Sequence, residues 1–153
     1  MFSFPKSAKL VTCASLLLLA SAALPAQQSG STSATPVLDY EFFKEKVQPI
    51  FLKKRPGHAR CVICHQHRVP PLQQFDPGAS TWNEQQSRKN FEMWSLFVVP
   101  GEPMKSVMLL HPLAKQAGGD GFHAGGKHFK SQNDPEWQIL SDWVNGKTNG
   151  GSQ

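Results

Sequence analysis

The sequence predicts a small all-α domain, and three observations support that fold class. Helix-start signals, Asp39 near one end and Asp134-Pro135 near the other, each precede a segment whose apolar residues recur every three or four positions. The chain between them is interrupted by prolines and glycines, which favour short helices and loops. We find no persuasive strand, so we expect the first and last helices to cross and pack against each other.

The first predicted helix runs from Tyr40 to about Gln48, with Asp39 as its N-cap. Pro49 cannot continue a regular helix, so it predicts a kink or a fresh turn at that point. The segment from Arg55 to Arg60 is expected to be a loop, and the proline-containing segment from His67 to Thr81 an extended loop. The apolar face of the helix consists of Phe43, Val47, Ile50 and Phe51.

Two helices are predicted in the middle of the chain. Asn83 with Gln86 resembles a capping box, which opens a helix toward Phe97. Pro103 fits the first position of the next helix, and Pro112 ends it. The apolar stripe of that helix consists of Met104, Val107, Met108 and His111, in which the two methionines are expected to fill the core.

The last helix follows a glycine-rich stretch over residues 117–126. It begins at Pro135 and ends at Gly146, because glycine readily adopts the left-handed conformation that closes a helix. Its apolar face consists of Trp137, Leu140, Trp143 and Val144.

Residues 1–26 have the pattern of a secretory signal peptide. Two lysines precede an apolar run from Leu10 to Leu24, which is too short to span a bilayer stably, and small residues follow. We expect cleavage after Ala26, with Ala23 as the alternative. This predicts a periplasmic or secreted protein whose mature form has no membrane-spanning segment.

The predicted mature chain has about 127 residues, the size of one domain. We expect a flexible linker over residues 27–37, the folded domain over residues 38–146 and a flexible tail over residues 147–153. Cleavage lowers the formal charge from +5 to +3, because 14 basic and 11 acidic residues remain. The basic residues form no patch interleaved with aromatic residues, and export also argues against a nucleic-acid partner.

The segment Cys61-Val62-Ile63-Cys64-His65 has the pattern C-x-x-C-H, the attachment signature of c-type haem. Two thiols separated by two residues lie along one helical turn, where they can form thioethers with the two vinyl groups of haem. His65 follows directly and can bind the iron as the proximal ligand. The sequence therefore predicts one covalent haem c per chain, held by Cys61, Cys64 and His65.

Other cysteine chemistry fits the sequence less well. Cys13 lies in the predicted signal peptide, and it precedes most of the apolar run, which argues against lipidation. The mature chain then keeps two cysteines, which excludes a four-cysteine zinc site. A zinc site of two cysteines and two histidines stays open, although His123 and His128 lie about sixty residues downstream of the motif. A thioredoxin-like site needs a strand-helix alternation that we do not find.

Four segments carry a family resemblance: Phe43 to Phe51, Val99 to Ser106, His123 to Lys127 and Asp134 to Val144. They resemble planctomycete-type c-type cytochrome domains over roughly residues 38–146. The resemblance implies a mono-haem, class I-like cytochrome c fold, in which the N- and C-terminal helices pack together and loops wrap the haem. By resemblance to loops after other haem-binding turns, the carbonyl of Pro70 or Pro71 is expected to accept a hydrogen bond from His65.

The distal ligand is expected in the loop before the last helix. Many domains of this group carry a Met-Pro there, which this chain lacks, whereas others carry a His-Gly-Gly type stretch, and His123 stands at that position. The neighbouring glycines also permit a close approach of the backbone. We expect His123 to bind the iron, with His128, His111 and Met108 as alternatives in that order. His58 and His67 flank the motif and are expected at the surface or the haem edge.

These features together predict a periplasmic mono-haem c-type cytochrome that transfers electrons and is not an enzyme. Its partner is expected to be a redox protein, and the basic N-terminal half of the domain could steer an acidic one. A haem enzyme such as a peroxidase, with an open sixth position, remains an alternative. A haem-bearing sensor or a subunit of a larger redox complex is another.

Overall fold

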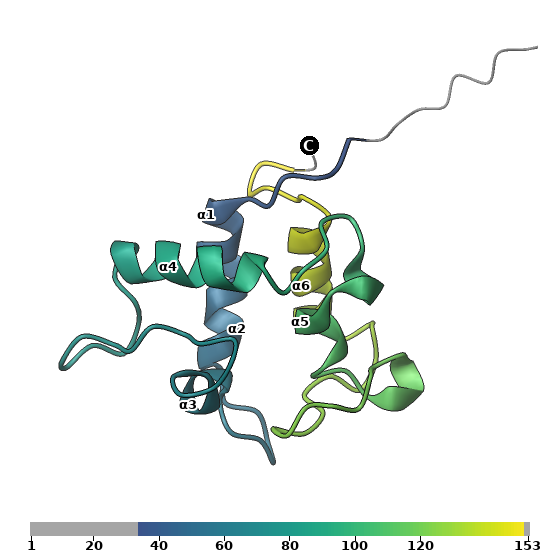
Figure 1. The fold of residues 1–153 in the computed structure, drawn as a ribbon, viewed down its shortest axis with the longest axis horizontal. Coiled ribbons are helices and arrows are strands. Elements are labelled where there is room, and N and C mark those ends of the chain that lie inside the picture. Colours follow the sequence, from purple (N-terminus) through teal and green to yellow (C-terminus); the bar gives the residue numbers. More distant parts are fainter. Residues whose placement is uncertain (1–33, 152–153) are drawn as a thin grey trace, which may run out of the picture. The chain divides into compact units, whose positions relative to one another are not determined.

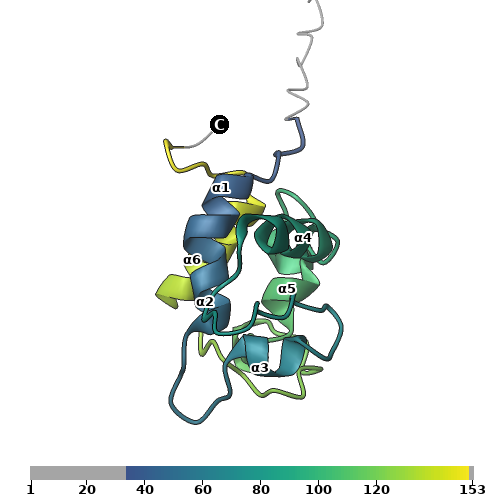
Figure 2. The same ribbon diagram turned by 90° about the vertical axis from the view of Figure 1, so that its left-hand side faces the viewer.

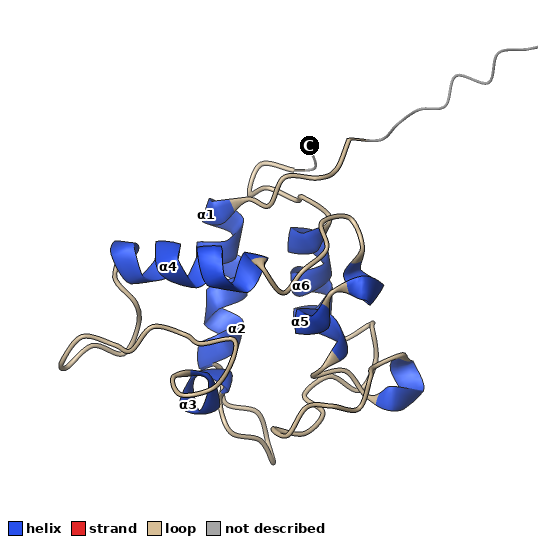
Figure 3. Cartoon of the chain, viewed as in Figure 1, coloured by secondary structure: helices blue, strands red, loops and turns tan. Residues whose placement is uncertain are grey.

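The structure is a computed structural model that describes residues 34–151, and in that range it is helical. The described backbone forms only isolated bridges, between Leu113 and Phe129 and between Thr148 and Gly151, and no strand (Figure 3). The predicted all-α class is therefore confirmed. The predicted signal peptide with Cys13, and the linker up to residue 33, lie outside the described residues. Among residues 34–151 no helix combines the length and apolarity needed to cross a membrane.

The first helix is longer than predicted and contains a π-helical turn. It consists of α1 (Tyr40–Phe42), the π-helical turn η1 (Phe43–Val47) and α2 (Gln48–Leu52) (Figure 2). The Asp39 carboxylate accepts a hydrogen bond from the Phe42 N–H at 2.6 Å, which confirms the predicted N-cap. Pro49 lies in the first turn of α2 and does not end the helix, because the wider π-helical turn accommodates its ring and its missing N–H.

The last helix, α6 (Pro135–Val144), packs against the first one as predicted. The Asp134 carboxylate accepts the Glu136 N–H at 3.0 Å and caps the helix. The fully buried ring of Trp143 lies 5.0 Å from that of Phe43, between centroids. The indole N–H of Trp143 also donates to the Asp39 carbonyl at 3.0 Å, so the two ends of the domain are joined in its core.

Helix α4 (Glu84–Ser95) begins with the predicted capping box, in which Asn83 and Gln86 bond each other's backbone N–H groups. It packs across the first helix through an edge-to-face contact of Phe91 with Tyr40, whose ring centroids lie 5.5 Å apart. An exposed ion pair between Lys44 and Glu84, with N and O atoms 2.6 Å apart, joins the same two helices.

The prediction of one continuous helix between Pro103 and Pro112 is wrong. A 3-10 turn, η2 (Pro103–Lys105), and the short helix α5 (Val107–Leu110) are separated at Ser106. The buried Ser106 hydroxyl donates to the Glu102 carbonyl and accepts the Val99 N–H, both at 2.9 Å, and so holds the break. Met108 is buried, but Met104 keeps 39% of its surface exposed and is not the core residue expected. A second 3-10 turn, η3 (Lys115–Ala117), follows.

Both described ends of the chain lie at the end of the first helix that is remote from α3 (Cys61–His65) (Figure 1). Pro36 packs against Gly146, just after α6. In the segment expected to be a flexible tail, the side-chain amide of Asn149 donates to the Glu45 carboxylate at 2.9 Å. The described part of that tail thus contacts the folded domain.

Candidate functional site

The segment Cys61–His65 forms one helical turn, α3, as the sequence predicts. The thiols of Cys61 and Cys64 are free, and both residues line a cavity of about 670 Å³. This volume is typical of cofactor sites. Burial raises the pKa of the Cys61 thiol, although the nearby Arg55 opposes that effect. The rest of the wall is largely apolar and includes Ile50, Phe51, Trp94, Phe97, Met108 and Leu140.

The imidazole of His65 is oriented by the loop that follows α3. Its Nδ1 lies 2.8 Å from the Pro70 carbonyl oxygen, so Nδ1–H donates and the Nε2 lone pair is free. Of the two prolines expected from the sequence, Pro70 is therefore the partner. Burial lowers the pKa of His65, and the bond to Pro70 only partly offsets this. The ring is thereby kept in the neutral form, which can bind a metal ion.

Buried polar groups hold this loop in place. The Pro71 carbonyl accepts the indole N–H of Trp94 at 3.3 Å, and the Gln73 N–H donates to the Asn90 side chain at 2.8 Å. Asn90 is fully buried and donates in turn to the Gln48 side chain at 3.3 Å. Sequence reasoning missed Asn90, although its position four residues before Trp94 on one face of α4 was a signal.

The ring of His123 faces that of His65 across the cavity. The two ring centroids lie 6.2 Å apart, and the ring planes differ by 12°. The Nδ1 of His123 lies 2.7 Å from the Gly126 carbonyl oxygen, so its Nε2 is also free of this bond. The two imidazoles thus share one arrangement, in which a backbone carbonyl fixes Nδ1 and leaves Nε2 available.

The separation of the two imidazoles is compatible with both of them binding one metal ion between them. A metal-to-imidazole bond of about 2 Å, with the ring centroid about 1 Å behind the nitrogen, separates two trans imidazole centroids by about 6 Å. The observed 6.2 Å agrees with that value. Within residues 34–151 no group of three or more His, Cys, Asp or Glu side chains is arranged to hold a metal ion.

The other candidate residues lie close to this pair. His128, His111 and Met108 all line the cavity. The ring of His128 lies 5.5 Å from that of His123, and burial, with the charges of neighbouring groups, lowers its pKa to about 4. The alternatives to His123 therefore line the same cavity, but His123 is the residue whose ring is nearly parallel to that of His65.

The histidines that flank the motif differ in their positions. His67 is exposed at the cavity wall, in keeping with the expectation of an edge group. His58 was expected at the surface or the haem edge, and its ring lies beside that of His128, with the centroids 4.5 Å apart and the planes tilted by 37°. The long loop after Leu52 carries His58 across to the segment before α6, which sequence spacing cannot reveal.

Comparison of the chain with protein-family models, with curated proteins and with solved structures finds no match.

Proposed function

We propose that this chain is a mono-haem c-type cytochrome that carries electrons. Cys61 and Cys64 would attach the haem through thioethers, with His65 as the proximal and His123 as the distal ligand. The observation that carries the proposal is the facing pair of imidazoles, 6.2 Å apart and nearly parallel, beside both thiols in one apolar cavity. The C-x-x-C-H pattern supports it independently.

The haem would supply one-electron chemistry, and the residues around the cavity would adjust it. The carbonyls of Pro70 and Gly126 fix the tautomers of the two histidines and increase the basicity of each Nε2. Two imidazoles place the potential below that of a site with one methionine ligand, because methionine raises it. The apolar wall limits the access of water to the site.

The pair of histidines favours an electron carrier over a haem enzyme or a gas sensor. Those alternatives need an open or easily displaced axial position. His123 is held by its own bond to Gly126 and lies opposite His65, so His65 and His123 would each offer a nitrogen donor to the iron of the haem. Slow or absent binding of carbon monoxide to the reduced protein would support the carrier.

The mouth of the cavity suits an acidic redox partner. The charged residues that line the cavity, other than histidines, are Arg60 and Arg68. Val69 and Phe122 also line it and expose 77% and 81% of their surfaces. A surface with exposed apolar side chains beside basic ones is suitable for a transient complex with an acidic partner. The proposal includes export after cleavage at Ala26, which the intact mass of the mature protein would check.

Haem attachment is tested by expression with a haem-attachment system, followed by denaturing electrophoresis and haem staining. The stain should follow the wild-type band and be lost in Cys61→Ala/Cys64→Ala, because thioethers survive denaturation. Cys13→Ala is the matched control, since it removes the thiol outside the motif, and it should retain the stain. A colourless wild-type protein that contains zinc would refute the proposal.

The distal ligand is tested by the spectrum of the oxidised protein. The wild type should be low-spin, and His123→Ala should become high-spin or bind added ligands. His128→Ala serves as the control and should remain low-spin, and His111→Ala should also remain low-spin at equilibrium because His111 is not the expected ligand. A far-red charge-transfer band of the kind given by a thioether ligand would instead identify a methionine such as Met108.

A further inference from the structure

The segment that carries His123 has little apolar packing to hold it. This segment, residues 119–127, is called here the His123 turn. It contains four glycines, and its one large apolar side chain, Phe122, is 81% exposed. A segment of this kind opens easily unless polar contacts fasten it. A ligand on it therefore needs support from outside the turn.

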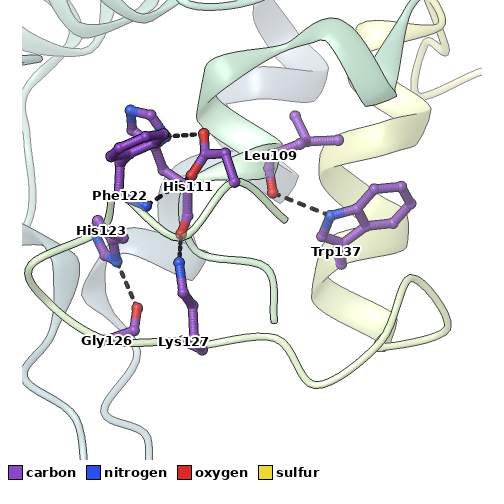
Figure 4. A network of polar contacts seen from close by, with 8 residues as sticks. Leu109, His111, Phe122, His123, Gly126, Lys127 and Trp137 are labelled. Carbon is purple, nitrogen blue, oxygen red and sulfur yellow. Dashed lines mark hydrogen bonds and ion pairs between the residues drawn. The ribbon is translucent and has the colours of Figure 1, made fainter. Parts of the chain in front are cut away.

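That support comes from His111, at the end of α5 (Figure 4). One carboxylate oxygen of Asp120 pairs with Nδ1 of His111, and the other accepts the Phe122 N–H at 3.0 Å. Burial raises the pKa of Asp120, but the bonds from Phe122 and His111 and the charge of Lys127 outweigh this and lower it. Asp120 is thus a carboxylate that joins His111 to the backbone immediately before His123.

The other end of the His123 turn is fastened to the same residue. The ammonium group of Lys127 donates to the backbone carbonyl of His111 at 2.8 Å. His111 is itself well anchored, because α5 contains the fully buried Leu109, whose carbonyl accepts the indole N–H of Trp137 at 3.4 Å (Figure 4). The His123 turn is therefore held at both ends by His111, which directly follows a helix that is packed in the core.

We propose that Asp120 is a positioning residue for the distal ligand, which keeps His123 over the cavity by tying its turn to His111. The inference rests on the proposed function and adds to it the group that controls how readily the distal ligand leaves. Because an external ligand can bind only after His123 moves away, the strength of the Asp120 tie sets the rate of that binding.

The test measures carbon monoxide binding to the reduced haem protein. Asp120→Ala should accelerate binding roughly tenfold or more, the order expected when a charge-assisted hydrogen bond is lost. Asp120→Asn should have a smaller effect, since its side-chain oxygen can still accept the Phe122 N–H. His111→Phe should reproduce the acceleration, and the double variant should add little to it. Asp142→Asn is the matched control, because Asp142 forms an exposed ion pair with Lys147 and should leave the rate unchanged.

The unfolding midpoint in urea, measured on the same variants, distinguishes the positioning role of Asp120 from a general contribution to stability. The positioning role is supported if Asp120→Ala binds carbon monoxide faster than a control variant that loses the same amount of stability. Wild-type binding rates in Asp120→Ala, alongside rapid binding in His123→Ala, would refute this role while leaving the proposed function intact. A protein without haem, or an unchanged His123→Ala variant, would overturn the proposed site and this inference with it.

Discussion

Asn90→Ala should destabilise the domain strongly, although Asn90 lies outside the cavity. Asn90 is fully buried, and its side chain accepts the Gln73 N–H at 2.8 Å and donates to Gln48 at 3.3 Å. The substitution removes both hydrogen bonds and leaves a buried Gln48 oxygen and a half-buried N–H without partners. With about 1 kcal/mol for each bond, and a further cost for the unpaired groups, we expect a loss of about 2–4 kcal/mol in the free energy of unfolding.

Urea unfolding followed by tryptophan fluorescence measures this loss, with an unchanged slope showing that the unfolded state is unaltered. Asn149→Ala is the matched control, because Asn149 also forms an amide hydrogen bond, to Glu45 at 2.9 Å, but on the surface. It should cost no more than about 0.5 kcal/mol. The Asn90 variant should also weaken the loop that presents the Pro70 carbonyl to His65, and so shift the reduction potential of the proposed haem. Equally small losses in the free energy of unfolding for Asn90→Ala and Asn149→Ala would refute this reasoning.

Three further outcomes are expected. Gly119→Ala should prevent the His123 turn from forming, because a Cβ atom there would collide with the Leu113 carbonyl; circular dichroism and the haem spectrum check this. Trp143→Ala should cost about 3–5 kcal/mol in urea unfolding, since its buried indole joins the first and last helices. Glu84→Gln should flatten the acid side of the stability profile: the bond from Lys44 is the main cause that lowers the pKa of Glu84, so the carboxylate stabilises the fold above pH 4.5 and loses this effect as the pH falls.

The features predicted correctly from the sequence depend on local chemistry. The caps at Asp39, Asn83 and Asp134 act within three residues of themselves, so short sequence patterns suffice to find them. The helical turn of α3 also follows from local spacing. The break at Ser106 was missed because its hydroxyl bonds two backbone groups of the preceding turn, and this competes with the apolar periodicity.

That Cys61, Cys64, His65 and His123 line one cavity could be anticipated in part for the same reason. The C-x-x-C-H pattern is contiguous, and the glycines beside His123 pointed to a close backbone approach. His111 and His128 also line the cavity, and only the orientation of the rings separates them from His123. The His123 ring is bonded to the Gly126 carbonyl, and the role we propose for Asp120 requires α5 and the His123 turn to meet in space. Sequence spacing alone does not contain this information.

The position of the two described ends has a practical consequence for electrochemistry. Pro36 packs against Gly146 and Asn149 bonds to Glu45, and both described ends of the chain lie away from α3 (Figure 1). A linker attached near either end would fix the protein to an electrode with the thiol-bearing turn directed toward the solution. Direct electron exchange between that electrode and the proposed haem should then be slow, while a soluble mediator should reach the cavity freely. Attachment through a cysteine introduced at exposed Val69 should reverse this preference.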